Sequence, residues 1–225
     1  MPSSTWRRQP DFMWKCGWRH RVKTFRLLLG SVAVCIAFAV PTALAEQLTH
    51  DENFRDAEAG DASALLKLKT QAVRGDPVSQ VELASMYMIG VSVPKDYAKA
   101  IKWNRAAANQ DVPNAEINLG LMYAAGLGTK QDYAQAARWW HKAANQGNAW
   151  GEYFLARLYL SGHGVEADRM QAYKWLELSK ENSKPGSKVY DQADHDLKNL
   201  EKAMGHRQIA KAKQATLAWA ATHRH

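Results

Sequence analysis

Cysteine is nearly absent from this chain of 225 residues, which contains only Cys16 and Cys35. Both lie among the first 45 residues, so the remainder of the sequence has no thiol. Without thiols, that remainder can form no disulfide, no thiolate zinc site and no cysteine nucleophile. We therefore expect its stability to come from side-chain packing alone.

Signature motifs of common enzyme classes are also missing. The sequence has no nucleophile elbow, no phosphate-binding loop, no dinucleotide-binding glycine fingerprint and no HExxH helix. We interpret His141 as a solvated surface histidine. The densest acidic group, Asp191, Asp194, His195 and Asp196, could bind a divalent cation, but Asp194 and His195 point to different faces of a helix. We therefore predict no catalytic residue, no metal and no cofactor.

The basic charge of the chain is unevenly distributed. The formal net charge is +8 for the whole sequence. The first 45 residues have seven Lys and Arg against one Asp, which leaves 23 basic and 21 acidic residues in 46–225. A nearly balanced segment without a basic run offers nucleic acid no electrostatic footprint, so we expect no nucleic-acid partner.

The basic N-terminal segment has the layout of a cleaved secretory signal peptide. A basic stretch at 19–26 precedes an apolar run at 27–40, and a small-x-small site ends at Ala45. The apolar run is short for a membrane span. We predict cleavage after Ala45, no stable membrane span afterwards, and a periplasmic or secreted mature chain beginning at Glu46. The alternatives are an uncleaved signal anchor and a translation start at Met13 instead of Met1.

A repeat of 36 residues occupies most of the remaining sequence. Six columns recur in three copies without a slip: Leu83, Leu119 and Leu155; Tyr87, Tyr123 and Tyr159; Gly90, Gly126 and Gly162; Asp96, Asp132 and Asp168; Ala100, Ala136 and Ala172; Trp103, Trp139 and Trp175. A fixed period of this length is typical of repeat architectures, in which each unit buries its apolar face against its neighbours.

Each copy is predicted to form two helices. In the second copy, apolar residues at helical spacing predict helix A over 114–125, which Gly126 ends. Asp132 is predicted to cap helix B, with a carboxylate that accepts hydrogen bonds from backbone N–H groups. We expect Trp139 to lie in the core of the repeat and Trp140 to be free for exposure.

These residues resemble the Sel1-like repeat family, which is related to the tetratricopeptide repeat. The second copy follows the family pattern from Ala115 through 119–123, 132–133 and 143–144 to Gly147. The first copy departs from it at Ala84, Ser92 and Asp111, and the third at Ala156, Arg169, Ser179 and Lys180. The resemblance implies an all-α, right-handed superhelix (solenoid) of helix-turn-helix repeats.

The predicted domain organisation follows from these boundaries. The signal peptide (1–45) and a flexible lead-in (46–60) precede a repeat region at 61–182, which divides into a half repeat (61–75) and full copies at 76–111, 112–147 and 148–182. Residues 183–225 are predicted to form C-terminal capping helices and a tail, because a repeat stack needs polar outer ends.

Positions that vary between copies are the candidates for partner recognition. Three such columns lie on helix A: Val78, Asn114 and Trp150; Glu82, Asn118 and Phe154; Ser85, Leu121 and Arg157. We predict partner contacts at Glu82, Ser85, Asn118, Leu121, Trp150, Phe154 and Arg157, since varying positions are free of the repeat pattern and aromatic and Arg side chains dominate interfaces. The alternative for Trp150 and Phe154 is burial under the C-terminal caps.

The repeat and the missing active site favour a non-enzymatic scaffold or adaptor that binds a protein or peptide of the cell envelope in the concave face. The family resemblance implies the same role. One alternative is a cell-wall ligand-binding or hydrolytic, β-lactamase-like protein, which a cysteine-rich branch of the family suggests, although this chain lacks the cysteines of that branch. Another is an accessory subunit of an envelope complex.

Overall fold

The structure is a computed structural model that describes residues 56–57 and 59–223. The predicted signal peptide (1–45) and most of the predicted lead-in (46–60) lie outside the described residues. The described part is helical and contains no strand. Its helices are α3 (Ala62–Val73), α4 (Pro77–Ile89), α5 (Tyr97–Ala108), α6 (Pro113–Ala125), α7 (Tyr133–Asn145), α8 (Ala149–Ser161), α9 (Arg169–Glu181), α10 (Lys188–Ala203) and α11 (His206–His223).

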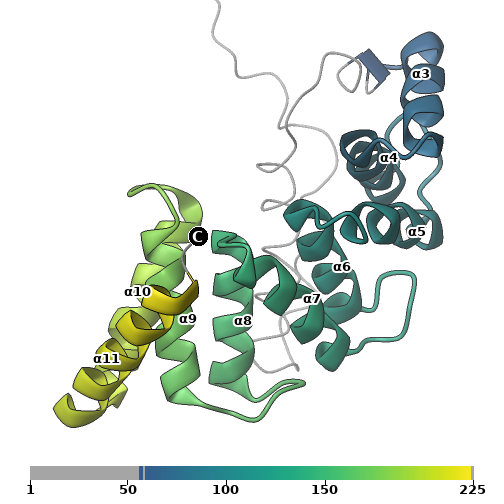
Figure 1. Cartoon of the computed structure of the whole chain (residues 1–225). Coiled ribbons are helices and arrows are strands. Elements are labelled where there is room, and N and C mark those ends of the chain that lie inside the picture. Colours follow the sequence, from purple (N-terminus) through teal and green to yellow (C-terminus); the bar gives the residue numbers. More distant parts are fainter. Residues whose placement is uncertain (1–55, 58, 224–225) are drawn as a thin grey trace, which may run out of the picture.

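Consecutive helices pack against one another along the chain (Figure 1). The pairs α4 with α5, α6 with α7, and α8 with α9 correspond to helices A and B of the three sequence copies. Helix α3 packs on α4 ahead of the first pair, while α10 and α11 pack on α9 behind the third. The predicted all-α helical-repeat solenoid is therefore confirmed.

The turn between helices A and B is closed in the same way in every copy. The carbonyl of the recurring tyrosine accepts a hydrogen bond from the backbone N–H of the recurring aspartate, in the pairs Tyr87 with Asp96, Tyr123 with Asp132, and Tyr159 with Asp168. The carboxylate of that aspartate then caps helix B, as where Asp132 Oδ1 accepts a hydrogen bond from Gln135 N at 2.9 Å. The predicted role of these aspartates as N-caps is confirmed.

Glycine in this turn lets neighbouring copies approach closely. Gly164 has a φ of +71°, and a Cβ placed there would lie 2.3 Å from the carbonyl carbon of Tyr133 in the preceding copy. Gly128 is equally close to the first copy, because a Cβ placed on it would lie 2.7 Å from Tyr97 Cβ. Both glycines therefore fix the distance between helix B of one copy and the turn of the next.

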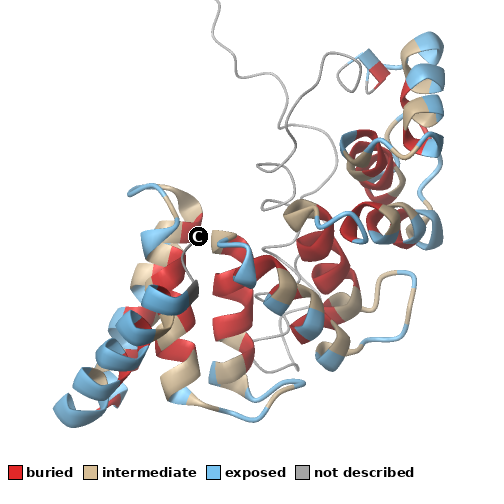
Figure 2. Cartoon of the chain, in the orientation of Figure 1, coloured by how far each residue is buried: buried red, intermediate tan, exposed pale blue. Residues whose placement is uncertain are grey.

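Buried side chains run through the whole stack, and most lie on α4 and α6 to α9 (Figure 2). The recurring leucines and alanines of the repeat are at most 1% exposed. The tryptophans differ from expectation: Trp140 is 0% exposed, whereas Trp139 is only half-buried. The prediction that Trp139 fills the core and Trp140 is free is therefore wrong.

Trp140 on α7 is buried because it packs between α6 and α8. Its indole Nε1 donates a hydrogen bond to the carbonyl of Ile117 at 3.3 Å, and its ring stacks on Phe154 with centroids 5.0 Å apart. A Cβ at Gly120 would lie 2.2 Å from Trp140 Nε1. Because Gly120 has no side chain, the indole of Trp140 can pack directly against the backbone of α6.

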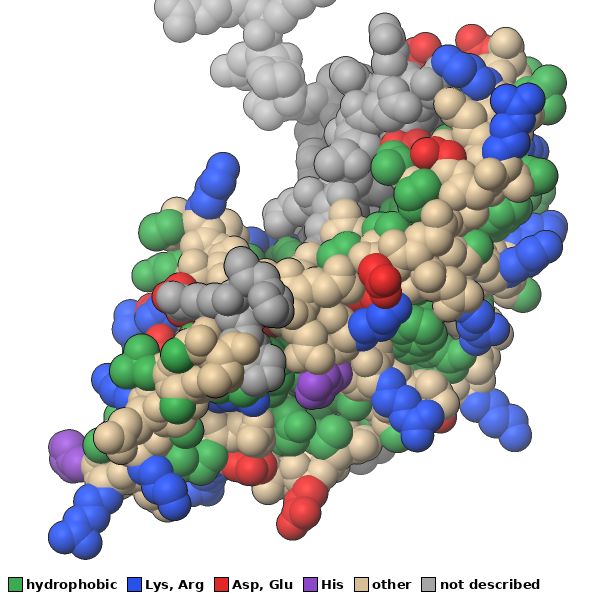
Figure 3. Space-filling model, in the orientation of Figure 1, with side chains coloured by type: hydrophobic (Ala, Val, Ile, Leu, Met, Phe, Trp, Pro, Cys, Tyr) green, Lys and Arg blue, Asp and Glu red, His purple; other side chains and the backbone are tan. Residues whose placement is uncertain are grey.

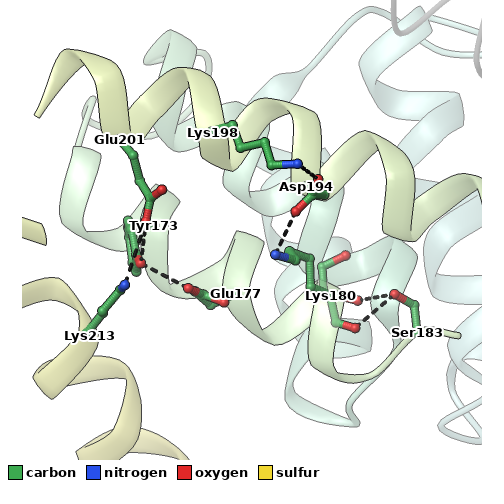
Figure 4. Close-up of polar contacts among 9 residues, drawn as sticks. Tyr173, Glu177, Lys180, Ser183, Asp194, Lys198, Glu201 and Lys213 are labelled. Carbon is green, nitrogen blue, oxygen red and sulfur yellow. Dashed lines mark hydrogen bonds and ion pairs between the residues drawn. The ribbon is translucent and has the colours of Figure 1, made fainter. Parts of the chain in front are cut away.

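Polar contacts attach the two C-terminal helices to the third copy (Figure 4). The hydroxyl oxygen of Tyr173 on α9 lies 2.9 Å from Glu177 Oε1 and 3.1 Å from Glu201 Oε1 on α10. Lys213 on α11 approaches Glu201 to 3.9 Å. Burial is the largest cause of the raised pKa of Tyr173, so its phenol stays protonated and can donate to these carboxylates.

Candidate functional site

Helices α6, α8 and α10 lie next to one another on one side of the stack. Helix α6 contacts α8, and α8 contacts α10, across the intervening B helices. We call the surface formed by α4, α6, α8 and α10 the A face. Because helices approach one another more closely on the inner side of a curved stack, the A face is where a concave binding surface is expected.

Most of the predicted partner-binding residues lie inside the protein. Their exposed fractions are 8% or less for Glu82, Ser85, Asn118, Leu121, Trp150 and Phe154, whereas Arg157 is half-buried. The expectation that these positions are free of core contacts is therefore wrong for six of the seven.

These columns vary because each position has a partner that varies with it. Asn118 Nδ2 donates a hydrogen bond to Asn104 Oδ1 on the preceding helix B, at 3.2 Å. In the next copy, the equivalent positions hold Phe154 and Trp140, which stack on each other. Variation in this column therefore records a change of contact between copies, from a polar pair to an aromatic one. Nothing in the column alone reveals that its partner lies 14 residues earlier.

Trp150 belongs to the same aromatic contact. Its ring stacks on Phe154 with centroids 5.5 Å apart and meets Tyr153 edge-on at 6.0 Å. Trp150 and Phe154 are thus buried by residues of the second and third copies rather than only by the C-terminal caps. At the other columns, Ser85 donates its hydroxyl hydrogen to the carbonyl of Val81 at 3.0 Å.

Arg157 is the predicted residue that does line an open cleft. Two cavities of about 600 and 360 Å³ lie between α8 and α10, and we call them together the α8–α10 cleft. Their polar and charged lining includes Tyr153, Arg157, Ser161, Arg169, Lys188, Asp191, Gln192, His195, Asp196 and Asn199. The cleft combines cations, carboxylates and amides on two rigid helices of the A face.

A three-residue relay crosses the α8–α10 cleft. Arg157 Nη1 donates to the hydroxyl oxygen of Tyr153 at 3.1 Å, and the Tyr153 hydroxyl donates to Asp196 Oδ2 at 3.2 Å. Burial raises the pKa of Tyr153 to about 12, so the phenol remains neutral and can donate. These bonds fix Arg157 and Asp196 in place at opposite walls, which favours recognition of a polar partner over chemistry.

The acidic group on α10 does not form a metal site in the described residues. Asp194 Oδ1 lies 2.7 Å from Lys180 Nζ, and its Oδ2 lies 2.6 Å from Lys198 Nζ (Figure 4). Hydrogen bonds from these two lysines lower the pKa of Asp194 to about 2. Within the part of the chain that the structure describes, no three His, Cys, Asp or Glu side chains are placed to share a metal ion.

One polar column inside the repeats was not predicted from the sequence. In every copy, an amide after helix B reaches the first turns of helix A: Gln110 Nε2 to Gln80 Oε1 at 2.9 Å, Gln146 Nε2 to Glu116 Oε2 at 2.8 Å, and Asn182 Nδ2 to Glu152 Oε1 at 2.8 Å. The detectable signal is that two columns 30 residues apart are polar in all three copies. These hydrogen bonds join the end of helix B to the start of helix A within the same copy.

The carboxylates of this column differ in their surroundings. Glu116 is fully buried and has Lys142 Nζ at 3.0 Å from its Oε1. Glu152 is 1% exposed, and its Oε2 has no hydrogen-bond partner among the described residues. The position equivalent to Lys142 is Leu178, so Glu152 lacks a cation. Burial therefore raises the pKa of Glu152 to about 8.

No helix in the described part combines the length and the apolar character that crossing a bilayer requires. The predicted cleavage site at Ala45 lies outside the described residues.

The repeats match the Sel1 repeat family at residues 77–112, 113–148 and 151–183. Among solved structures, the chain is similar to a Sel1 repeat protein from Oxalobacter formigenes, with 35% identity and a TM-score of 0.53, covering 60% of this chain and 97% of that one. A protective antigen of uropathogenic Escherichia coli with an SLR fold shows 24% identity and a TM-score of 0.52, covering 85% of this chain but 48% of that one. No curated protein matches.

Sel1 repeats form a non-enzymatic scaffold fold, and proteins built from them generally serve as scaffolds for protein interactions. The three matched repeats and the solved relative of which nearly the whole length is covered agree with the helix pairs described above. This chain belongs to the Sel1 repeat family.

Proposed function

We propose that the protein is an exported scaffold that binds a protein or peptide segment of the cell envelope on its A face and catalyses no reaction. The observation that carries this proposal is the α8–α10 cleft, in which Arg157 and Asp196 are held apart by Tyr153 on two helices of a Sel1 repeat stack. Rigid polar groups beside a groove can select a partner without a catalytic step.

Site-specific photo-crosslinking tests the binding surface. A photoreactive phenylalanine derivative would replace Gln192 in the cleft or, as a control, the exposed Lys130 in the turn after α6. We expect a covalent product with one partner protein from position 192, little from position 130, and loss of the product when Arg157→Glu is added. Equal products from both positions, or a product indifferent to Arg157→Glu, would contradict binding in this cleft.

Export is tested separately on the full chain expressed in a Gram-negative host. The basic, apolar and small-residue order of 19–45 supports a signal peptide. Intact-mass analysis should find a chain that begins at Glu46 in the periplasmic or secreted fraction. An unprocessed chain that stays with the membrane would instead support a signal anchor.

A further inference from the structure

A second groove lies beside α7 and α9 and borders the α8–α10 cleft at Leu160 and Arg169. One cavity of about 1120 Å³ and one of about 630 Å³ adjoin between α7, the end of α8 and α9, and share His141, Tyr159 and Val165. We call them together the α7–α9 groove. It is lined by the B helices α7 and α9, by the second half of α8 and by the turn at 162–168, whereas the α8–α10 cleft lies between α8 and α10.

The α7–α9 groove has an apolar floor with charged edges. Leu155 is buried beneath it, while Leu160 is 38% exposed at one end. Figure 3 shows hydrophobic side chains over α7 and α8, with Lys, Arg, Asp and Glu side chains at their border. Such a surface suits a partner that is itself both apolar and charged.

Cations dominate the charged edges. The lining contains Arg138, Lys142, Arg169 and Lys174 in addition to His141, against the two carboxylates of Glu166 and Asp168. The Asp168 carboxylate is already occupied, because it accepts hydrogen bonds from the backbone N–H groups of Met170 and Gln171 at the start of α9.

Lys174 is a partly buried cation that lies against two aromatic rings. Its ammonium group lies 4.2 Å from the ring centroid of Trp175 and 5.0 Å from that of Trp219. Among the described residues, no carboxylate lies within ion-pair distance of Lys174 or of the exposed Arg138. Burial lowers the pKa of Lys174, because desolvation disfavours the charged form, and the nearby Asp168 carboxylate opposes this shift only in part.

We propose that the α7–α9 groove is a second docking surface, which takes an acidic, partly apolar peptide segment of another protein, with carboxylates on Arg138 and Lys174. The complementary charge of the groove selects an anion. Its apolar floor favours a peptide with hydrophobic side chains over a uniformly polar polyanion.

Fluorescence anisotropy with a matched pair of labelled peptides tests the proposal on the full chain. The acidic probe is Asp-Glu-Leu-Glu-Phe-Asp-Glu-Leu, and its counterpart carries Asn and Gln in place of every Asp and Glu. We expect the acidic probe to bind and the amide counterpart to bind at least about tenfold more weakly, with the difference shrinking as salt rises because exposed charges are screened. Equal binding of both peptides would overturn the proposed charge selection.

Variants of the protein locate the binding site. Arg138→Gln combined with Lys174→Gln should weaken binding of the acidic probe at least about tenfold, since both proposed anchors are removed. Lys130→Gln, at an exposed turn, and Arg157→Gln, in the α8–α10 cleft, should leave it unchanged. Arg138→Gln alone serves if Lys174→Gln reduces folding, because Arg138 is exposed.

Two further results would overturn the proposal. One is binding that persists in the Arg138→Gln variant and in the double variant. The other is tighter binding of polygalacturonate than of the acidic peptide with the same dependence on Arg138, because the groove would then select an anionic polysaccharide rather than a peptide.

Discussion

The contact between the first and second copies and the contact between the second and third occupy equivalent positions but differ in chemistry. Asn104 and Asn118 form a buried amide pair at the first contact, whereas Trp140 and Phe154 stack at the second. The backbone repeat is the same in both. One scaffold geometry therefore accepts either a polar or an aromatic contact, provided that both partners change together.

The largest expected effect comes from breaking the aromatic contact. Trp140→Ala removes a fully buried indole between Gly120 and Phe154 and should lower the free energy of unfolding by about 3–5 kcal/mol. Asn104→Ala, at the equivalent position, leaves a buried amide partner unsatisfied and should cost about 1–3 kcal/mol. Urea unfolding of both variants measures the difference, and equal losses would contradict the distinction between the two contacts.

The second and third copies also differ at a buried carboxylate, because Glu116 has Lys142 beside it whereas Glu152 has no cation among the described residues. This difference predicts that the stability of the protein depends on pH through Glu152. The pKa of Glu152 is about 8 in the folded chain against a usual 4.5. Between these two pH values the carboxyl group is therefore protonated in the folded state and ionised in the unfolded state. Stability should therefore fall as pH rises from 4.5 to about 8. Glu152→Gln should remove this fall and raise the stability at pH 9 by about 2–4 kcal/mol.

A reciprocal variant in the first copy provides the control. Gln80 occupies the position of Glu152 and is bonded to Gln110 in the same way. Gln80→Glu should therefore introduce the decline with pH that Glu152→Gln removes. Urea melts between about pH 5 and 9 would detect both changes. A flat profile for Gln80→Glu would mean that burial in this column does not govern the protonation of its carboxylates.

A smaller effect is expected from the glycine that accommodates Trp140. Gly120→Ala places a Cβ against the indole and should cost about 1–3 kcal/mol through overpacking. The third copy has Ala156 with Leu176 at the equivalent positions. Combining Gly120→Ala with Trp140→Leu reproduces that pairing, so the two substitutions should cost less together than the sum of their separate effects. A double-mutant cycle from thermal or urea melts tests this coupling, which additive costs would disprove.

The sequence was sufficient to predict the repeat, its helix pairs and the aspartate caps, because these features recur at the same positions. It was insufficient for the side chains that differ between copies. Phe154 was expected to be available to a partner, yet its aromatic contact depends on Trp140, and no period links the two. Periodicity identifies what copies share, whereas contacts between variable columns depend on which helices touch.

The candidate site shows the same division. Arg157 lines the α8–α10 cleft, but Tyr153 and Asp196 were not predicted to join it, because Asp196 lies on a helix outside the repeat. The Glu152 column was missed for a different reason. Glu is normally exposed, so a sequence pattern assigns it to the surface, and only packing against the end of the same copy reveals its burial.

The smallest expected effect on stability is at Arg157, which contrasts with the buried members of its own column, Ser85 and Leu121. Arg157 is half-buried and contacts the hydroxyl and ring of Tyr153. Arg157→Ala should therefore lower the free energy of unfolding by about 1 kcal/mol or less, whereas Leu121→Ala should cost about 2–5 kcal/mol. Urea melts of the two variants compare them directly. A loss at Arg157 as large as that at Leu121 would assign Arg157 to the core and remove it from the α8–α10 cleft as a recognition residue.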